Sequence, residues 1–293
     1  MNIYNSASEC PDILPRNSVV NADFLDVLKY IPDASIDLIF IDPPYLSTDL
    51  DFDEAGFDMP TLKKELARVI KPSGYLACFG TIELLADFVN PFSIRFSGVW
   101  LKPRGTMRTK TAKKPMSKCE PYAVYCLKGA KICDMTFNKL KIAGEPYSKK
   151  HTNTGYKRDG KDSLSRSDNS GWTQDGYVSE NDGFRWQTDV IEAPNKPCMK
   201  HADRTAHPTQ KPVEALSTIV QWLTNENDIV LDCFAGSGSL GETCIKLNRD
   251  FILIEKDTKH GYFNDIIVPR LTNTIAAKNA QLFTDKSTLI RCE

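Results

Sequence analysis

The chain has 293 residues, and its formal net charge is −1 because 37 basic residues nearly balance 38 acidic ones. With 41% hydrophobic residues, the composition is that of a globular protein with an ample core, and no repeats, coiled-coil heptads or low-complexity tails occur. Bulk charge therefore says nothing about nucleic-acid binding, and any basic surface must be local.

Several other classes of protein are excluded. No apolar run approaches the length of a membrane span, and the polar residues 1–6 are no signal peptide. The nine cysteines contain no CxxC pair, and the four histidines make no ligand spacing with them, so we expect no metal site. An odd number of cysteines without a framework indicates reduced thiols, and we expect a cytoplasmic protein.

The first 80 residues alternate between strand and helix patterns. Apolar residues at Phe24, Val27 and Leu28 have helical spacing. Such alternation indicates a parallel sheet with crossover helices. We expect strands at 18–21, 38–41 and 75–79, and helices at 23–30 and 62–71.

A rigid loop, Asp42-Pro43-Pro44-Tyr45, follows the strand at 38–41. Neither proline donates to a β-ladder or continues a helix, so Asp42 and Tyr45 are held at the carboxyl end of a buried strand. Open α/β sheets bind their ligands there. A carboxylate accepts hydrogen bonds from an amino group and a tyrosine stacks on a flat ring, so the pair would clamp an exocyclic amine on a heteroaromatic base. The alternative is a Pro-Pro turn with a solvated aspartate.

Two further strands are expected at 96–101 and 121–127, and the loop between them is strongly basic. Clustered cations indicate contacts to phosphates, which position a polyanion without reading its sequence. The alternative is a solvated lysine-rich loop. The cations are Lys102, Arg104, Arg108, Lys110, Lys113, Lys114 and Lys118.

Helix and strand periodicity mostly vanish between residues 128 and 206. Gly, Ser, Asn, Asp and Lys dominate this stretch, but aromatic residues interrupt it. Disordered segments are usually poor in aromatics, so we expect an irregular folded insertion. Our hypothesis is that it provides specificity for an extended ligand, and the alternative is a decoration without function.

Regular structure returns with an expected helix at 212–223 and expected strands at 229–231 and 251–254. A glycine-rich loop follows the first of these strands and permits close approach of the backbone to a ligand. Glu255 ends the second strand about 20 residues after the first glycine, as expected for a carboxylate that holds ribose hydroxyls. The glycines are Gly236, Gly238 and Gly241.

Two interpretations of this loop compete. Its GxGxxG spacing would indicate a nicotinamide or flavin enzyme, but a lone GxGxxG is a weak signal and nothing else in the chain asks for hydride chemistry. Combined with the amine clamp at Asp42, a nucleoside-binding half indicates a nucleoside cofactor that delivers a group to an amine. This combination predicts S-adenosylmethionine and methyl transfer.

Three motifs resemble those of DNA amino-methyltransferases of the beta group. In this group the catalytic loop comes first, the recognition region lies in the middle and the cofactor loop comes last. The resemblance covers residues 18–270 and is weakest at 130–200. The motifs are Asp42-Pro43-Pro44-Tyr45, His207-Pro208-Thr209-Gln210-Lys211-Pro212 and Phe234-Ala235-Gly236-Ser237-Gly238.

The resemblance implies a Rossmann-like, S-adenosylmethionine-dependent methyltransferase fold. Its seven-stranded mixed sheet would be circularly permuted, with an irregular target-recognition insertion. The implied parts are a catalytic half at 1–128, a target-recognition region at 129–206 and a cofactor-binding half at 207–293.

The resemblance also implies where the cofactor binds. The glycine loop would line its methionine part, with Asp232 near the amino group. Glu255 would take the ribose hydroxyls, and Asp23 would face the adenine ring. The segment with Lys211 would close over the methionine end. The implied cofactor-binding residues are Asp23, Lys211, Asp232, Phe234, Gly236, Ser237, Gly238 and Glu255.

The implied catalytic residues are Asp42, Pro43, Pro44 and Tyr45. Asp42 and a backbone carbonyl of the proline pair would accept the N–H bonds of a flipped-out base, and Tyr45 would stack on that base. Relatives whose tetrad begins with Asp mostly modify adenine N6, whereas those that begin with Ser mostly modify cytosine N4. We therefore expect an adenine-N6 enzyme. An N4-cytosine enzyme and a catalytically silent DNA-binding relative are the alternatives.

Duplex DNA is the expected partner, with the basic residues at 102–114 as contacts. A homodimer, a cognate restriction endonuclease, a solitary role and a phage origin in a prokaryotic host are all compatible with the resemblance. The sequence departs from the family at Cys119-Glu120, where His-Glu is common. We expect this pair not to touch the chemistry.

Overall fold

The structure, a computed structural model, describes residues 1–43, 58–106, 113, 115–151, 177–200, 203–257 and 259–290. The chain forms two compact units. Unit 1 comprises Met1–Asn138 and Asp189–Glu293, and unit 2 comprises Lys139–Thr188. Unit 2 is thus an insertion in the chain of unit 1, and it is shorter than the region at 129–206 expected to recognise the target.

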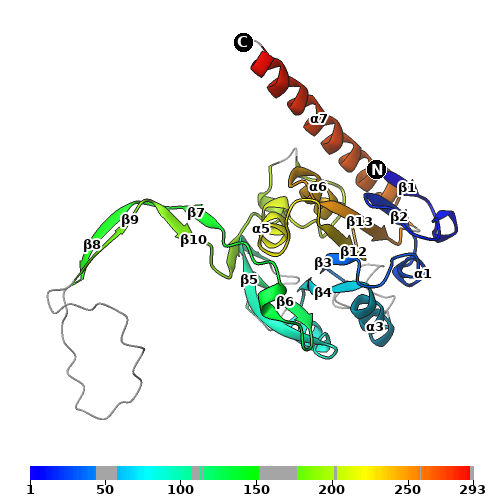
Figure 1. The fold of residues 1–293 in the computed structure, drawn as a ribbon, viewed down its shortest axis with the longest axis horizontal. Helices are drawn as coiled ribbons and strands as arrows, with labels where there is room; N and C mark the ends of the chain where they lie inside the picture. The colour runs from blue at the N-terminus through cyan, green and yellow to red at the C-terminus, as the bar shows by residue number, and fades with distance from the viewer. Residues whose placement is uncertain are drawn as a thin grey trace. The chain divides into compact units, whose positions relative to one another are not determined.

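Within the described ranges, a mixed sheet of nine strands forms the centre of unit 1 (Figure 1). The strands are β1 (Asn2–Tyr4), β2 (Ser18–Asn21), β3 (Ile36–Ile41), β4 (Ile70–Phe79), β5 (Phe92–Thr106), β6 (Ser117–Leu127), β11 (Val190–Glu192), β12 (Ile229–Asp232) and β13 (Asp250–Glu255). Their order in the sheet is β1-β2-β13-β12-β3-β4-β6-β5-β11. From β1 to β4 neighbours are parallel, whereas β6 is antiparallel to both β4 and β5.

The predicted mixed sheet is confirmed, with two strands more than expected. The three-residue strands β1 and β11 extend its two edges. All four residues of β12 are buried, and β3 is buried except at Asp37, which is typical of parallel strands covered on both faces.

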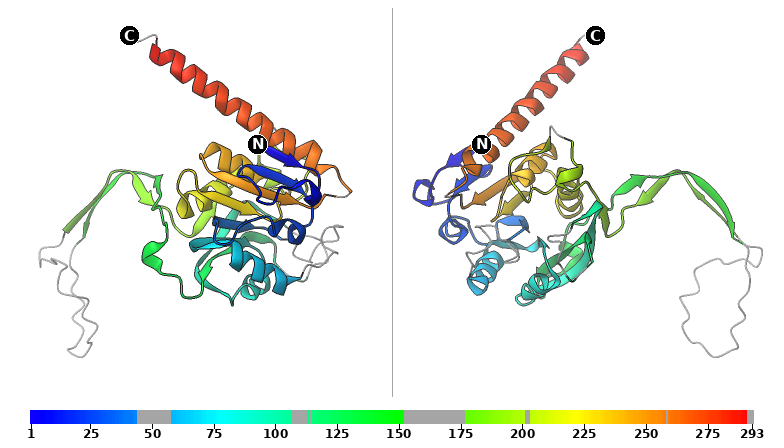
Figure 2. Two further views of the ribbon diagram at one scale, coloured as in Figure 1. Left: turned by 45° about the vertical axis from the view of Figure 1, so that its right-hand side comes forward. Right: turned by 180° about the vertical axis from the view of Figure 1, so that it is seen from behind.

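Helices cover both faces of the sheet. The buried side chains of α1, α3 and α4 form one cluster with the strand residues Ile39, Leu76 and Leu231. Figure 1 shows β3, β4, β12 and β13 between α1 and α3 on one side and α5 and α6 on the other, and Figure 2 shows unit 1 from two other directions. The helices are α1 (Phe24–Leu28), α3 (Met59–Val69), α4 (Ile82–Asp87), α5 (Val213–Leu223), α6 (Ser239–Lys246) and α7 (Val268–Ile290), with short turns η1 (Ala7–Glu9), η2 (Ile132–Asp134), η3 (Lys196–Cys198) and η5 (Phe263–Ile267).

Several predicted boundaries were wrong: the strand expected at 75–79 begins at Ile70, and the strand expected at 96–101 extends over Phe92–Thr106. The helix expected at 62–71 ends at Val69, because Ile70 has extended backbone (ψ 139°) and begins β4. Among the helices in the described ranges, none combines the length and apolar character that a membrane crossing requires.

Unit 2 contains two antiparallel ribbons that the sequence did not predict. Large side chains on them remain exposed, among them Tyr147, Phe184 and Trp186. The first ribbon pairs β7 (Lys141–Ala143) with β10 (Phe184–Trp186), and the second pairs β8 (Tyr147–His151) with β9 (Tyr177–Asn181).

Candidate active site

Four acidic residues lie at the carboxyl ends of neighbouring parallel strands. Asp23 follows β2, Glu255 ends β13, Asp232 ends β12 and Asp42 follows β3. Because these strands pair in this order, the four residues line one edge of the sheet. Ligands of open α/β sheets bind in the crevice outside such strand ends.

A sharp turn after β12 brings the backbone N–H of Gly236 to Glu255. The Gly236 N–H donates to Glu255 Oε2 at 2.6 Å. Gly236 (φ +54°) and Gly238 (φ +71°) both have left-handed backbone, which other residues disfavour. A Cβ atom on Gly236 would lie 3.3 Å from the Cε1 atom of His207. Glycine at position 236 therefore serves both the turn and the close approach to His207.

Burial disfavours the ionised forms of the two carboxylates beside this turn, Asp232 and Glu255. Asp232 is 4% exposed, and its Oδ1 accepts a hydrogen bond from the Phe234 N–H at 2.9 Å. Burial raises the pKa of Asp232 well above its usual value, although the Phe234 N–H and Lys211 oppose the shift. Burial likewise raises the pKa of Glu255 to about 7. A ligand with an ammonium group and hydroxyl donors would stabilise the ionised forms of both carboxylates.

Asp23 is the N-terminal cap of α1, and its side chain also contacts Lys256, the residue after β13. Its Oδ1 caps the helix by accepting the Leu25 N–H at 3.0 Å, and its Oδ2 lies 3.0 Å from Lys256 Nζ. The ring of Phe234 packs against that of Phe24, with centroids 5.1 Å apart. The turn after β2 and the turn after β12 therefore lie in contact.

Ser237 is buried in the glycine turn. Its Oγ lies 2.8 Å from Ser239 Oγ, and its carbonyl accepts a hydrogen bond from Arg270 at 3.1 Å. Gly238 then caps α6 and packs close to Ile267. These contacts fix the turn between β12 and the first turn of α6.

Side-chain bonds to the backbone hold the segment before α5 in place. Gln210 is 3% exposed, and its Oε1 accepts hydrogen bonds from the N–H and the hydroxyl of Thr205. Its Nε2 donates to the Asp203 carbonyl at 2.7 Å. Lys196 donates to the His207 carbonyl at 2.6 Å. These bonds therefore hold Lys211, the residue after Gln210, in a fixed position.

The uncharged ring of His207 packs against the glycine turn. Its ring lies 5.0 Å from that of Tyr262 and beside Gly236. Burial, with the positive charges of Lys196 and Lys211, lowers the pKa of His207 to about 4. The imidazole is therefore uncharged at neutral pH.

Lys211 joins the site to β5 and β6 through four alternating charges. Its Nζ lies 2.5 Å from Asp42 Oδ2 and 3.0 Å from Glu120 Oε1, and Glu120 Oε2 lies 2.8 Å from Lys102 Nζ. The four side chains are between 10% and 19% exposed. We name Asp42, Lys211, Glu120 and Lys102 the ion chain.

Glu120 and Lys211, two members of the ion chain, remain ionised at neutral pH. Burial alone would raise the pKa of Glu120, but Lys211 and Lys102 outweigh burial and lower it to about 2. Burial alone would lower the pKa of Lys211, but Asp42 and Glu120 raise it above its usual value. Each of these two charges is therefore maintained by its neighbours of opposite sign.

The ion chain bears on three expectations drawn from the sequence. Lys211 pairs with Asp42, and its expected place at the methionine end of a cofactor stays a prediction. Glu120, expected not to touch the chemistry, binds the lysine that pairs with Asp42. Lys102 is bound to Glu120 and only 11% exposed, so it does not belong to a solvated basic loop.

Other predicted site residues are placed in part. Pro43 is buried beside Asp42, whereas Pro44 and Tyr45 lie outside the described residues. Arg104 and Lys113 are exposed. In the described ranges, no three His, Cys, Asp or Glu side chains group as a metal site. The remaining predicted DNA contacts, Arg108, Lys110 and Lys114, lie outside the described residues.

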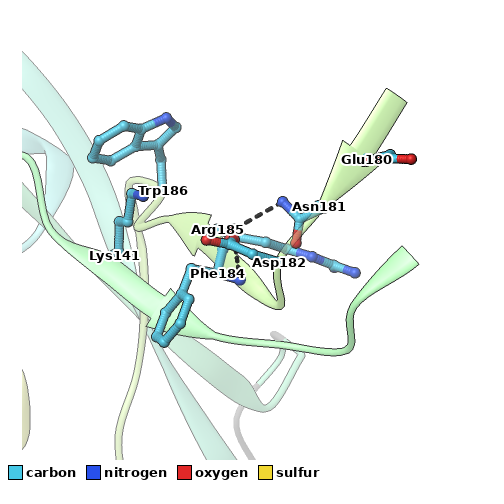
Figure 3. A pocket seen from close by; sticks show the side chains of 7 residues that line it. All are labelled: Lys141, Glu180, Asn181, Asp182, Phe184, Arg185 and Trp186. Atoms are coloured by element: carbon cyan, nitrogen blue, oxygen red, sulfur yellow. Dashed lines mark hydrogen bonds between the residues drawn. The ribbon is translucent and has the colours of Figure 1, made fainter. Parts of the chain in front are cut away.

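Unit 2 has an open hollow of about 660 Å³ where its two ribbons meet (Figure 3). Lys139 and Lys141 lie over the ring of Trp186, which is 58% exposed. Arg185 lies over the ring of Tyr147, at 5.8 Å from its centroid. This surface combines flat rings with positive charge, and the lining also includes Glu180 and Asp182.

Comparison with known sequences gives one family and several relatives. Residues 36–264 match the N6/N4 family described as DNA methylase. The type II methyltransferase M.BglII from Bacillus subtilis is 27% identical over 263 residues, which are 82% of this chain and 66% of that protein. The type II methyltransferase M2.LlaDCHI from Lactococcus lactis subsp. cremoris is 28% identical over 249 residues, covering 83% of this chain and 85% of that protein. The chain therefore spans slightly less than two thirds of the length of M.BglII.

Solved structures confirm the fold. The M1.HpyAVI–SAM complex matches with a TM-score of 0.55 and 22% identity, over 86% of this chain and 98% of that one. PvuII DNA methyltransferase, described as cytosine-N4-specific, matches with a TM-score of 0.54 and 14% identity over 93% of both chains. The mixed α/β methyltransferase fold implied by the sequence motifs is thus the fold of this chain.

Removing the central cation of the ion chain should destabilise the fold. In Lys211→Met, two carboxylates that are only 15% and 19% exposed lose their shared cation, so we expect the free energy of unfolding at pH 7 to fall by about 3–5 kcal/mol. Lys71→Met is the control, because Lys71 is 36% exposed in its pair with Asp37 and should contribute at most about 1 kcal/mol. Urea unfolding measures both variants. Equal losses of unfolding free energy in the two variants would contradict the role of Lys211 as the central cation of the ion chain.

Proposed function

This chain belongs to the N6/N4 DNA methylase family, and we propose that it transfers a methyl group from S-adenosylmethionine to the N6 amino group of an adenine in duplex DNA. The observation that carries this proposal is the position of Asp42. Its carboxylate lies at the carboxyl end of β3, next to the strand that leads into the glycine turn. An acceptor for an amine and a turn suited to a nucleoside cofactor thus lie on adjacent strands.

The residues around the glycine turn fit S-adenosylmethionine. The cofactor carries an ammonium group, which suits the buried Asp232, and ribose hydroxyls, which suit Glu255. The left-handed turn at Gly236 allows close approach of the backbone. We propose that Phe234, Ser237 and the two glycines 236 and 238 line the methionine part and that Asp23 faces the adenine ring. When bound, S-adenosylmethionine supplies an electrophilic methyl group.

Asp42 would act on the target amine by accepting its N–H bond. An exocyclic base amine is a poor nucleophile because its lone pair is delocalised into the ring. A hydrogen bond to Asp42, and a second to a carbonyl of the Pro43-Pro44 segment, would favour a tetrahedral nitrogen with a localised lone pair. Because Lys211 already neutralises part of its charge, Asp42 serves as an oriented acceptor of the N–H bond.

The choice of adenine rests on the tetrad. Relatives whose tetrad begins with Asp mostly modify adenine N6, and this tetrad begins with Asp42. Cytosine N4 is the alternative that the same experiment distinguishes. Tyr45 is proposed to stack on the flipped base.

Unit 2 and the exposed cations are proposed to bind the DNA. Exposed rings stack on unpaired bases or wedge between base steps, and lysine or arginine beside them pairs with phosphates. Trp186 with its two lysines and Tyr147 with Arg185 supply both kinds of group. Arg104 and the loop cations at 108, 110, 113 and 114 would add phosphate contacts. Since two relatives are named type II methyltransferases, we also propose a restriction endonuclease of the same recognition sequence as a partner.

Nucleoside mass spectrometry tests the function directly. The purified protein is incubated with S-adenosylmethionine and unmodified bacterial DNA, and the digested DNA is analysed. We expect N6-methyldeoxyadenosine, and sequencing of the marks gives the recognition site. N4-methyldeoxycytidine would replace adenine by cytosine in the proposal, and no methylated base would contradict it.

Asp42→Asn should abolish most turnover while leaving cofactor binding nearly unchanged. The amide retains the shape of the side chain but loses its charge, so we expect a fall in kcat on the order of a hundredfold or more. Asp37→Asn is the matched control, since Asp37 is a lysine-paired carboxylate at the other end of β3. Rates are measured with labelled cofactor and affinity by calorimetry. Turnover of Asp42→Asn near that of the control would exclude the amine-acceptor role.

Cofactor affinity should increase as the pH rises through the pKa of Glu255, about 7. The ionised carboxylate is the stronger acceptor for hydroxyls, and one unit below its pKa only about a tenth is ionised, which predicts up to about tenfold weaker binding at pH 6 than at pH 8. The stability of the unliganded protein should change in the opposite direction with pH. Because folding raises the pKa of Glu255 from 4.5, the protonated carboxyl stabilises the folded state at low pH, and this stabilisation is lost as the pH rises through about 7.

Calorimetry with S-adenosylhomocysteine, the demethylated cofactor, measures this dependence. The part that Glu255 contributes is the part lost in Glu255→Gln, since Asp232 and Asp257 also influence the site electrostatically. An identical pH profile in both proteins would show that Glu255 does not bind the ribose.

Alanine at Trp186 or Phe184 should weaken DNA binding without affecting the cofactor. Loss of one stacking ring predicts an increase in Kd for DNA on the order of tenfold, with kcat at saturating DNA unchanged. Ile82→Ala on α4 is the control, because Ile82 is also an exposed apolar residue, at 73%, but lies in unit 1. Fluorescence anisotropy with duplex DNA measures the Kd. Equal affinities for all variants would rule out this surface as a DNA contact.

A further inference from the structure

Glu120 is a member of the ion chain to which the reaction described above assigns no role. It lies on β6, and its carboxylate bridges Lys211 and Lys102 at 3.0 and 2.8 Å. It is 15% exposed, and Lys211 is 10% exposed. A glutamate in such a position is costly to desolvate unless its partners are fixed.

The surroundings show that Glu120 determines where Lys211 lies. A lysine ammonium group is a point charge on a flexible four-carbon chain, so a single carboxylate leaves it several orientations. Here Asp42 and Glu120 both bind Lys211, and the ring of Phe79 lies 5.6 Å from Lys211 Nζ. Three contacts from three strands, β3, β4 and β6, therefore fix one nitrogen atom.

The far end of the ion chain is anchored as well. Lys102 Nζ lies 4.8 Å from the centre of the Trp100 ring. The indole Nε1 of Trp100 donates to the Ala193 carbonyl at 2.9 Å, and the indole meets Phe79 edge-on at 6.3 Å. Lys102 and Glu120 thus form a fixed base for Lys211.

We propose that Glu120 is a positioning residue for methyl transfer, which holds Lys211 on Asp42 so that the Asp42 carboxylate keeps one orientation when the target amine arrives. The inference rests on the proposed function, because it assigns Asp42 to the amine. Glu120 itself does not touch the reactants. It acts through Lys211, and Lys102 balances its charge.

Two substitutions of Glu120 separate its contact from its charge. Glu120→Ala removes the acceptor, and we expect kcat to fall on the order of tenfold to a hundredfold because the Asp42 carboxylate loses its fixed orientation. Glu120→Gln retains an acceptor oxygen and should recover part of the rate. KM for both substrates should remain within about twofold of wild type, because the positioning acts on the reacting group.

Glu65→Ala is the matched control. Glu65 is a half-buried glutamate that binds Arg68 at 2.8 Å on α3, so its loss tests the removal of a salt bridge remote from Asp42. All rates are measured well below the melting temperature of each variant. If Glu120→Ala does not fold, Glu120→Gln provides the comparison with the control. A kcat within twofold of wild type for the folded variant would overturn the proposal.

A double-variant cycle tests whether Glu120 acts through Lys211. Lys211→Arg keeps the positive charge but changes its geometry. If Lys211 carries the effect, adding Glu120→Gln to Lys211→Arg should lower kcat by less than it does in the wild-type background. Fully multiplicative losses would show that Glu120 acts by another route, and the proposal would fail.

A readout independent of activity distinguishes failure of this inference from failure of the proposed function. Nitrogen-15 NMR detects slowly exchanging lysine ammonium groups, and the Lys211 signal is assigned by its absence in Lys211→Arg. We expect it in the wild type and expect its loss or broadening in Glu120→Gln. An inactive wild-type protein with this pattern would reject methyl transfer but retain the positioning, whereas an unchanged signal in an active protein would reject only the positioning.

Discussion

One ammonium group between two largely buried carboxylates is the contact on which this candidate active site depends. Asp42 and Glu120 project from β3 and β6, with β4 between these strands, and Lys211 enters from a segment 169 residues after Asp42. Two negative charges at this separation would repel and take up protons without the lysine. The geometry of Asp42, the carboxylate proposed to accept the amine, therefore depends on three remote parts of the chain that fold together, and the fixed turn around Gln210 supplies the third.

The order of strands explains how a site is built from the two ends of the sequence. β12 enters between β3 and β13, so the strand that leads into the glycine turn lies directly beside the strand that ends at Asp42. Parallel pairing in register aligns both carboxyl ends at one edge of the sheet. The electrostatics differ along that edge. Asp42 is paired with Lys211, whereas burial raises the pKa values of Asp232 and Glu255. We propose that a bound ligand stabilises the ionised forms of these two carboxylates.

Much of this arrangement could be predicted from local pattern, and the rest could not. Strand ends are marked by abrupt changes from apolar to polar residues, so the positions of Asp42, Asp232 and Glu255 at strand ends were predictable. The ion chain was not, because it depends on the antiparallel register that places Glu120 opposite Trp100. Lys102 looked like its basic neighbours in the sequence, and only this register shows that it faces inward. The ribbons of unit 2 consist of strands of three to five residues, too short to produce a clear period in the sequence.

The points where the chain leaves and re-enters unit 1 are both clamped. At the exit, Asn138 donates its side-chain amide to the carbonyls of Gln221 and Thr224, each at 2.9 Å. At the return, the Asp189 carbonyl accepts the Tyr122 hydroxyl at 2.9 Å and the Val99 N–H at 3.1 Å. With both anchor points held by unit 1, the entropy of joining them depends only weakly on the length of the chain between them. A chain of different length at residues 139–188 would therefore change the closure entropy little, and the contacts at both anchor points would lie within unit 1 as before.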